Sequence, residues 1–254
     1  MEFQIKGDNL QFVIIKIDQG EELYAEAGKM FFKMPNVKME TKAAGEGIGG
    51  KIMGAIKRKV AGESLFTTHF TVGSGSSGVV SFAGEFPGRI EAVDVSEVPF
   101  LAQKDAFICA ENTVDFNIEF QKKIGAGLFG GEGFILEKFS GKGKVFIHAG
   151  GDFFVKQLQP GEKLQVDTGS VVGFESTVKY DVQLAEGIMT ALFGGEGLFL
   201  TTLEGPGKVI LQSMTLSKLR RQIGVMRHTK GGKQGSELDI VGNVVNSFFG
   251  GSSD

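Results

Sequence analysis

One hexapeptide occurs twice in the sequence without a change, and it constrains the fold more than any other feature. The motif Leu-Phe-Gly-Gly-Glu-Gly occupies residues 128–133 and residues 192–197, and a weaker copy surrounds Glu63. The glutamates of the three copies recur at nearly regular intervals, which indicates an internally repeated structural unit. We therefore predict that three copies of one unit build most of the chain.

A second landmark recurs at similar intervals and supports the same interpretation. It is a leucine followed five positions later by a small residue, and its members are Leu23 with Gly28, Leu101 with Ala106, and Leu164 with Gly169. We predict three β repeats at residues 1–97, 98–157 and 158–218, which together form one compact body. Residues 219–254 are predicted to form a basic linker and a C-terminal arm.

Each repeat ends in two short apolar segments that flank a glycine-rich turn. Glycine contributes 39 of the 254 residues without a three-residue period, so collagen is excluded and many tight turns are expected. We interpret the paired segments as three equivalent β-hairpins. Their strands are 65–72 and 79–83, 134–139 and 144–149, and 198–203 and 208–213. Short strands separated this often by turns predict an all-β barrel or sandwich.

Two kinds of segment have helical rather than strand spacing. Ile48, Ile52, Ile56 and Val60 are four residues apart ahead of the first hairpin, and similar pairs precede the other two, so we expect a short helical segment at each place. Near the C-terminus, Ser236 precedes an apolar stripe that ends at two glycines. The stripe consists of Ile240, Val241, Val244, Val245, Phe248 and Phe249. We predict an amphipathic helix there that docks by its apolar face.

The composition restricts the environment and the partners. The single cysteine, Cys109, lies in an apolar run, so the chain can form neither an internal disulfide nor a multi-cysteine zinc site, and a reducing compartment is expected. The formal net charge of −3 gives no general attraction to nucleic acid. Because the first 18 residues mix charges into apolar positions and no apolar run is long enough to span a bilayer, we expect a soluble, cytoplasmic protein.

The sequence contains no recognisable catalytic or cofactor motif. The glycine-rich hexapeptide lacks the Lys-Ser/Thr pair of a phosphate-binding P-loop, and its glutamate would repel an anion. No serine-nucleophile elbow is present, and the apolar surroundings of Cys109 would raise the pKa of its thiol. His69, His148 and His228 have no second ligand at metal-binding spacing, so we predict core or solvated histidines. We assign no catalytic, cofactor or metal residues.

The repeated hexapeptide is instead predicted to be structural. Its glycines would allow two backbone segments to approach closely, and its glutamates would accept hydrogen bonds at a repeated junction. The residues assigned to this role are Glu63, Gly130, Gly131, Glu132, Gly194, Gly195 and Glu196.

Two segments are candidate contact elements because each combines basic residues with an apolar face. This combination is typical of segments that lie on anionic membranes. The alternative is a solvated run of charge beside a segment that packs on its own body or on a neighbouring subunit. The candidate contact residues are Lys51, Lys57, Arg58, Lys59, Ile240, Val244, Phe248 and Phe249.

The three glycine-rich units, the hexapeptide pair and the segment Leu23–Lys33 together resemble the AIM24 family, from about Phe3 to Leu216. These are bacterial and archaeal proteins of unassigned biochemistry, related to a fungal mitochondrial protein. The resemblance implies a double-stranded β-helix of the kind seen in the tryptophan RNA-binding attenuation protein, and a homotrimer. Since the fungal relative is tied to inner-membrane organisation, the resemblance also implies a membrane-proximal scaffold, and it implies no catalytic residues.

The sequence therefore favours a non-enzymatic, oligomeric β scaffold whose partner is a protein or an anionic membrane surface. Two other functions stay open at this point. One is a small-ligand or metal-binding enzyme with a cupin-like β pocket. The other is RNA binding by analogy of fold, which is disfavoured because the chain is acidic, has no tryptophan and has two tyrosines. We expect no nucleic-acid partner.

Overall fold

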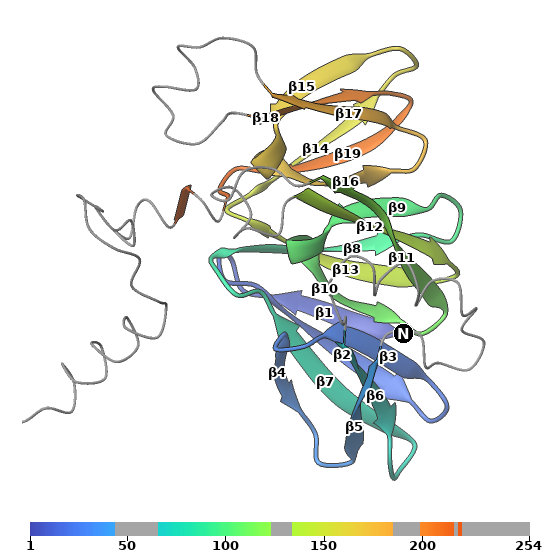
Figure 1. Ribbon diagram of the computed structural model, residues 1–254. Coiled ribbons are helices and arrows are strands. Elements are labelled where there is room, and N and C mark those ends of the chain that lie inside the picture. Colours follow the sequence, from blue (N-terminus) through green and yellow to red (C-terminus); the bar gives the residue numbers. More distant parts are fainter. Residues whose placement is uncertain (44–65, 123–133, 185–198, 216–217, 220–254) are drawn as a thin grey trace, which may run out of the picture. The chain divides into compact units, whose positions relative to one another are not determined.

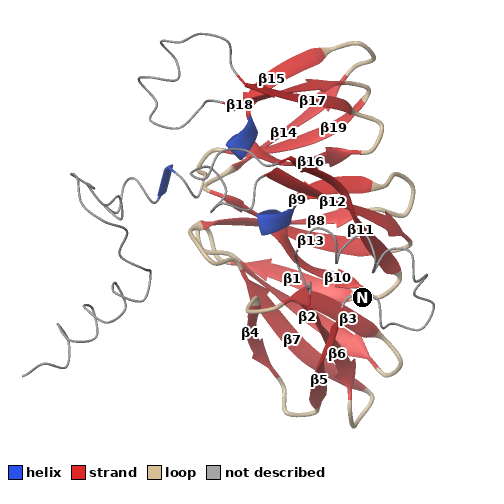
Figure 2. Cartoon of the chain, viewed as in Figure 1, coloured by secondary structure: helices blue, strands red, loops and turns tan. Residues whose placement is uncertain are grey.

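The computed structural model describes residues 1–43, 66–122, 134–184, 199–215 and 218–219. The chain divides into two compact units, Met1–Leu219 and Arg220–Asp254, and all the described residues belong to the first. Strands make up most of this unit, and its complete helical elements are the three-residue 3-10 turns η1 (Lys104–Ala106) and η2 (Thr168–Ser170) (Figure 2). The all-β prediction is confirmed. The predicted helical segments and the C-terminal helix lie outside the described residues.

The strands fall into three successive sets of six, preceded by β1 (Glu2–Lys6) (Figure 1). The first set is β2 (Phe12–Asp18), β3 (Glu22–Glu26), β4 (Met30–Lys33), β5 (Val37–Ala43), β6 (Phe66–Val72) and β7 (Ser77–Ala83). The second is β8 (Gly88–Asp94), β9 (Phe100–Gln103), β10 (Phe107–Glu111), β11 (Val114–Lys122), β12 (Phe134–Gly141) and β13 (Lys144–Gly150). The third is β14 (Phe153–Leu158), β15 (Lys163–Asp167), β16 (Val171–Glu175), β17 (Lys179–Leu184), β18 (Phe199–Glu204) and β19 (Gly207–Gln212).

The same antiparallel pairing recurs in every set. The first strand pairs with the sixth, and the sixth with the third; the second strand pairs with the fifth, and the fifth with the fourth. The second and third sets follow the same rule. Three copies of one fold are therefore visible in the ladders. The limits predicted after residues 97, 157 and 218 stay predictions.

The predicted hairpins are wrong, although their strands are present. The fifth and sixth strands of each set follow one another in the chain, but they belong to different sheets, and neither is the other's ladder partner. The glycine-rich turn between them therefore connects two layers instead of closing a hairpin. An apolar strand, a glycine turn and a second apolar strand fit both arrangements, so the local pattern could not distinguish them.

The described strands form four sheets, which we number from first to fourth along the chain. Their strand orders are β1-β2-β7-β4, β5-β6-β3-β10-β13-β8, β11-β12-β9-β16-β19-β14 and β15-β18-β17. Each six-stranded sheet combines three strands from one set with three from the next. The two halves are joined by β3 with β10 in the second sheet, and by β9 with β16 in the third.

Three apolar cores lie between successive sheets. The first core contains Val13 and Phe82 from the first sheet and Phe70 from the second. The second core lies between the second and third sheets, and the third core between the third and fourth. β2 alternates buried and half-buried residues, as expected of a strand with one covered face, whereas β10 is buried along almost its whole length because cores cover both of its faces.

One predicted landmark is displaced by a residue. Leu23 and Leu164 lie opposite Phe70 and Leu203 on the fifth strand, but the equivalent position in the second set, opposite Phe139, is Phe100. Leu101 is the next residue and belongs to the third core. A shift of one residue reverses the face of a strand, and leucine and phenylalanine exchange freely at core positions, so matching leucine to leucine was misleading.

Candidate functional site

The candidate contact residues and the residues of the repeated motif lie outside the part of the chain that the structure describes. This holds for the basic candidates Lys51, Lys57, Arg58 and Lys59, for the C-terminal candidates Ile240, Val244, Phe248 and Phe249, and for the motif residues Glu63, Gly130, Gly131, Glu132, Gly194, Gly195 and Glu196. Their roles stay predictions. The described residues present a different candidate, which is the joint between successive sets of strands.

The joint has the same register both times it occurs. The ladder between β3 and β10 pairs Leu23 with Glu111, Tyr24 with Ala110, and Ala25 with Cys109. The ladder between β9 and β16 pairs Phe100 with Glu175, Leu101 with Phe174, and Ala102 with Gly173. In both, the second strand of one set meets the third strand of the next.

β4 and β15 have the same strand positions but lack this partner in the described chain. β4, the third strand of its set, pairs only with β7, and β15, the second strand of its set, pairs only with β18. β4 also carries the irregularity of its equivalents, since the ladder with the sixth strand shifts register between Met30 and Phe32, as it does at matching points of β10 and β16. The first and fourth sheets therefore end in two complementary free edges.

The residues of β4 show what the missing partner would cover. Met30, Phe31 and Phe32 are 37%, 58% and 40% exposed. The equivalent residues of β10 and β16 are buried. Exposed aromatic side chains on a free strand edge are typical of an interaction surface, because natural proteins usually protect such edges with charge or proline.

A hollow of about 380 Å³ lies beside the free edge of β15. Its walls come from β14, the end of β15, η2 and β19. Phe154 and Val155 on β14 are 55% and 51% exposed. The lining residues are Asp152, Phe153, Phe154, Val166, Asp167, Ser170, Leu211, Gln212 and Ser213.

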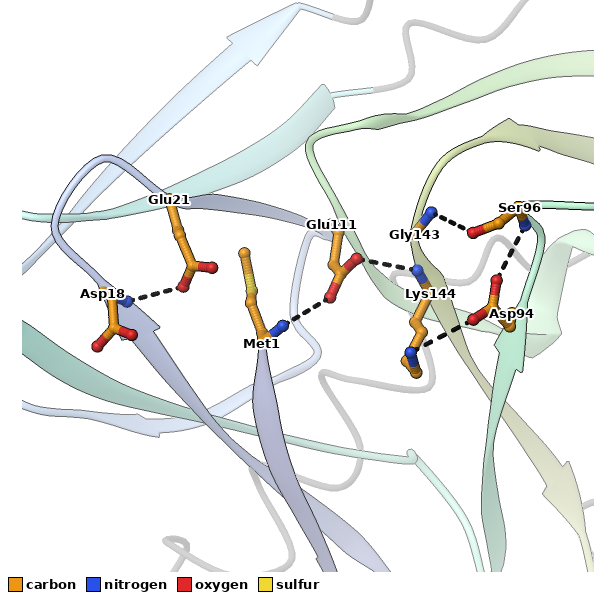
Figure 3. A network of polar contacts seen from close by, with 8 residues as sticks. All are labelled: Met1, Asp18, Glu21, Asp94, Ser96, Glu111, Gly143 and Lys144. Atoms are coloured by element: carbon orange, nitrogen blue, oxygen red, sulfur yellow. Dashed lines mark hydrogen bonds and ion pairs between the residues drawn. The ribbon is translucent and has the colours of Figure 1, made fainter.

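A repeated glutamate supports each joint and was missed in the sequence. The carboxylate of Glu111 accepts a hydrogen bond from the backbone N–H of Lys144 at 3.1 Å and contacts the Met1 ammonium at 3.3 Å (Figure 3). Glu175 accepts the N–H of Lys208 at 2.8 Å. The signal was available: Glu-Asn-Thr-Val begins at residue 111 and Glu-Ser-Thr-Val at residue 175.

Further polar contacts hold the turn before β13. Asp94 accepts the N–H of Ser96 at 2.9 Å and contacts the Lys144 ammonium at 3.4 Å, while the N–H of Gly143 donates to the Ser96 hydroxyl at 3.1 Å (Figure 3). The hydrogen bonds to Ser96 lower the pKa of Asp94. This network fixes the turn that brings Lys144 to Glu111.

A group of charges surrounds the buried Lys29, the residue before β4. The ammonium of Lys29, which is 6% exposed, lies 3.1 Å from Glu85 and 3.4 Å from Glu26. Burial raises the pKa of Glu26. Burial, followed by the charge of Lys29, lowers the pKa of His148 to about 4, so this imidazole is neutral at pH 7. His148 packs edge to face on Phe86 with ring centroids 4.7 Å apart, as predicted for a core histidine.

Two further reactive side chains of the described residues are His69 and Cys109. A His69 ring nitrogen lies 2.6 Å from Glu22, which also binds Lys42 at 3.1 Å. Cys109 is free and fully buried, and burial raises the pKa of its thiol. The described ranges contain no group of three or more His, Cys, Asp or Glu residues placed to hold a metal ion. Nor do they contain a helix long and apolar enough to cross a bilayer.

Comparison with known proteins gives similarity over most of the chain. A family model described as mitochondrial biogenesis AIM24 matches residues 3–214. An uncharacterized protein of Streptococcus pyogenes serotype M6 is 32% identical over 217 residues, which are 83% of this chain and 85% of that protein. The X-ray crystal structure of a Streptococcus pyogenes protein superposes with a TM-score of 0.70 at 26% identity, over 87% of this chain and 97% of that chain.

Proposed function

Because the chain belongs to the AIM24 family, we propose that it is a non-enzymatic β scaffold whose copies join head to tail, β15 of one copy with β4 of the next. One observation carries this proposal: strands β2, β7 and β4 of the first sheet and the three strands of the fourth sheet are the two halves of the six-stranded sheet that the chain completes twice within itself, and β1 is an added strand beyond β2. Joined, β17-β18-β15 and β4-β7-β2 would reproduce the strand order of the second and third sheets.

The internal joints fix the register of the proposed contact. Val166 would lie opposite Phe32, Gln165 opposite Lys33, and Leu164 opposite Met34, as the equivalent pairs do at β3 with β10 and at β9 with β16. The two surfaces differ, so the contact is heterologous, and such contacts form closed rings when the rotation between copies closes. The family resemblance sets the expected ring at three copies.

Paired cysteines test this register. One doubly substituted chain carries Lys33→Cys with Gln165→Cys, and a second carries Met34→Cys with Leu164→Cys. Adjacent positions of an antiparallel ladder alternate between wide and close pairs, so one of the two chains brings its cysteines near disulfide distance. We expect a ladder of linked species under oxidation, ending at three subunits, and no ladder from the four single variants, since Cys109 is buried. A wild-type chain that is monomeric at every concentration, with no ladder from either double variant, would refute the proposal.

The proposal includes a cytoplasmic position near a membrane surface. The basic segment with Lys57, Arg58 and Lys59 and the C-terminal arm are its candidate contacts, on the sequence pattern given above. The test is co-sedimentation with phosphatidylglycerol vesicles, against phosphatidylcholine vesicles as the control. We expect binding that falls when these three residues are neutralised and residues 235–254 are deleted; unchanged binding by that variant would remove the assignment.

A further inference from the structure

Each core within the chain is completed by side chains from the next set of strands. In the first core the second set contributes Ile90, Ile108, Cys109 and Phe146, with Ala92 packed against them, and three of these, Ile90, Ile108 and Phe146, have counterparts in the second core. In the second core they are Phe153, Val172 and Ile210. The members of each trio hold the same three places in the fold: one on the first strand, one at the irregularity of the third strand, and one on the sixth strand. We call such a trio the plug of a core.

Two of the residues beside a plug are equivalent in the first two cores. They are Ala25 and Phe82 in the first core and Ala102 and Ile147 in the second, whereas the counterpart of Val13 in the second set is Glu91, which belongs to no core. The ladders place Phe154, Val166 and Leu211 at the matching positions of the third core. All three line the hollow beside β15. The hollow therefore occupies the place of a plug.

The described members of the third core come only from the second and third sets of strands, so this core has no plug of its own. The exposure of its lining agrees, because Phe154 is 55% exposed where Val13, its counterpart in the first core, is fully buried. The 380 Å³ hollow is thus the unfilled end of an apolar core.

Among the described residues, the equivalent trio of the first set of strands belongs to none of the three cores. The equivalent residues are Phe12, Phe31 and Ser81. Ser81 is fully buried and its hydroxyl donates to the carbonyl of Val13, so Phe12 and Phe31 are the members that a partner can receive. Phe31 is 58% exposed and packs edge to face on Phe12, with ring centroids 5.4 Å apart. Phe31 is larger than its equivalents Ile108 and Val172, while Ser81 is smaller than its equivalents Phe146 and Ile210. In this trio the third-strand residue therefore supplies a larger share of the apolar volume than in the other two.

We infer that the hollow is a binding site for Phe31 of a second copy of this chain, with Phe12 behind it. This inference rests on the proposed head-to-tail scaffold and names the side chain that closes it. The insertion completes the third core as Ile108 and Val172 complete the first two. Phe31 is then the aromatic anchor of the contact, seated in a preformed apolar pocket near the centre of the interface.

Phe31→Ala tests the inference, with Met39→Ala as the matched control. Both side chains are large, apolar and about half exposed, so we expect both variants to fold, but Met39 lies on β5, away from the joint. We expect Phe31→Ala to weaken self-association at least about tenfold in sedimentation velocity over a dilution series, as removal of an anchor does. Met39→Ala should leave it unchanged. If the two variants self-associate equally well, while the wild type still assembles and the paired cysteines still form disulfides, the role of Phe31 is refuted. The head-to-tail scaffold is not refuted by that result.

A mixing experiment tests the direction of insertion. Ser170→Trp fills the hollow but keeps a working Phe31, whereas Phe31→Ala keeps a working hollow. We expect each variant to be mainly monomeric alone and the mixture to form a dimer containing one of each, because only one competent contact exists per pair. No dimer in the mixture of two folded variants would contradict the inference. If Ser170→Trp fails to fold, the comparison of Phe31→Ala with Met39→Ala still decides.

Discussion

Two glycines show how single residues shape the joint. Gly143 and Gly207 have φ values of 153° and 145° and follow the turn that leads into the sixth strand. A Cβ on Gly143 would lie 2.5 Å from the carboxylate of Glu111, and one on Gly207 would lie 3.3 Å from that of Glu175. These glycines therefore allow the glutamates to reach the backbone N–H groups that they bind.

Gly143→Ala should destabilise the fold by about 2–4 kcal/mol, because it adds backbone strain and displaces the hydrogen bond of Glu111. Gly161→Ala is the control, since Gly161 has a φ of 78° but no atom within 4 Å of the added Cβ. It should cost about 1 kcal/mol. Urea unfolding of the two variants measures the difference, and equal losses would show that Glu111 does not depend on Gly143.

His148 gives the chain a pH dependence of known sign. Its pKa is about 4 in the folded protein and about 6.5 in an unfolded chain, so the unfolded state binds more protons between these values. The stabilisation is therefore complete above about pH 6.5 and is lost as the pH falls toward 4. Its size is about 3 kcal/mol at 1.36 kcal/mol per pKa unit.

His148→Gln should remove this part of the pH dependence. Glutamine occupies the equivalent position of the third set as Gln212, where it bonds backbone groups of Gly150 and Gly169 at 2.8 Å. The measurement is the free energy of unfolding at pH 7 and pH 5 for both proteins. The raised pKa of Glu26 changes the free energy of unfolding with pH in the opposite sense. Both proteins contain Glu26, so its contribution cancels in the comparison. The same loss between the two pH values in variant and parent would contradict the assignment.

At the scale of the element, β4 is the strand whose sequence departs most from its equivalents. β10 and β16 end in Glu111 and Glu175, whereas β4 ends at Lys33 and Met34 follows it at the matching position. Two residues before the position of these glutamates, Phe32 of β4 aligns with Cys109 and Gly173. The two positions therefore differ. The internal joints have a carboxylate at the position of Met34, and they have none at the position of Phe32.

Phe32→Glu and Met34→Glu place the same charge on the same edge, two residues apart. Phe32→Glu should abolish assembly, because a carboxylate would be buried opposite Val166 without a partner, at a cost of about 2–5 kcal/mol. Met34→Glu should preserve assembly, because it recreates the glutamate of the internal joints. Native mass spectrometry measures both. Loss of assembly in both variants, or in neither, would contradict the register.

The strands of each repeat could be predicted from the sequence, but their partners could not. The glycine turn after Phe139 and the apolar residues around it identified β12 and β13 correctly as strands. Their interpretation as a hairpin failed because local alternation does not record which sheet a strand joins. The glutamates Glu111 and Glu175 were likewise visible as a repeated Glu-x-Thr-Val, but the hydrogen bonds to Lys144 and Lys208 depend on residues far away in the chain.

At the scale of the whole molecule, the described part of the unit Met1–Leu219 contains two complete six-stranded sheets, one half-sheet extended by β1, and one three-stranded half-sheet. The repeat count and the family were readable from the sequence, whereas the free edges were not, because an edge is defined by a partner that is missing. β4 and β15 share no sequence signal that marks them as complementary. Their relation emerges only when the joints at β10 and β16 are compared with them.

Deletion of residues 220–254 should leave the assembly intact, because both proposed edges belong to the unit Met1–Leu219. Light scattering of the truncated chain should give the same number of subunits as the full chain. A monomeric truncated chain that remains folded would move the contact to the C-terminal unit and contradict the edge-to-edge account.

Amide hydrogen exchange tests the completion of the half-sheets most directly. The account predicts that amides of β4 and β15 exchange as slowly as those of β10 and β16 when the protein is assembled, and that they accelerate on dilution to the monomer. The outer strand β17 serves as the internal reference, since it is an edge strand of the described sheets in both states. Fast exchange of β4 and β15 at every concentration, at the rate of β17, would contradict it.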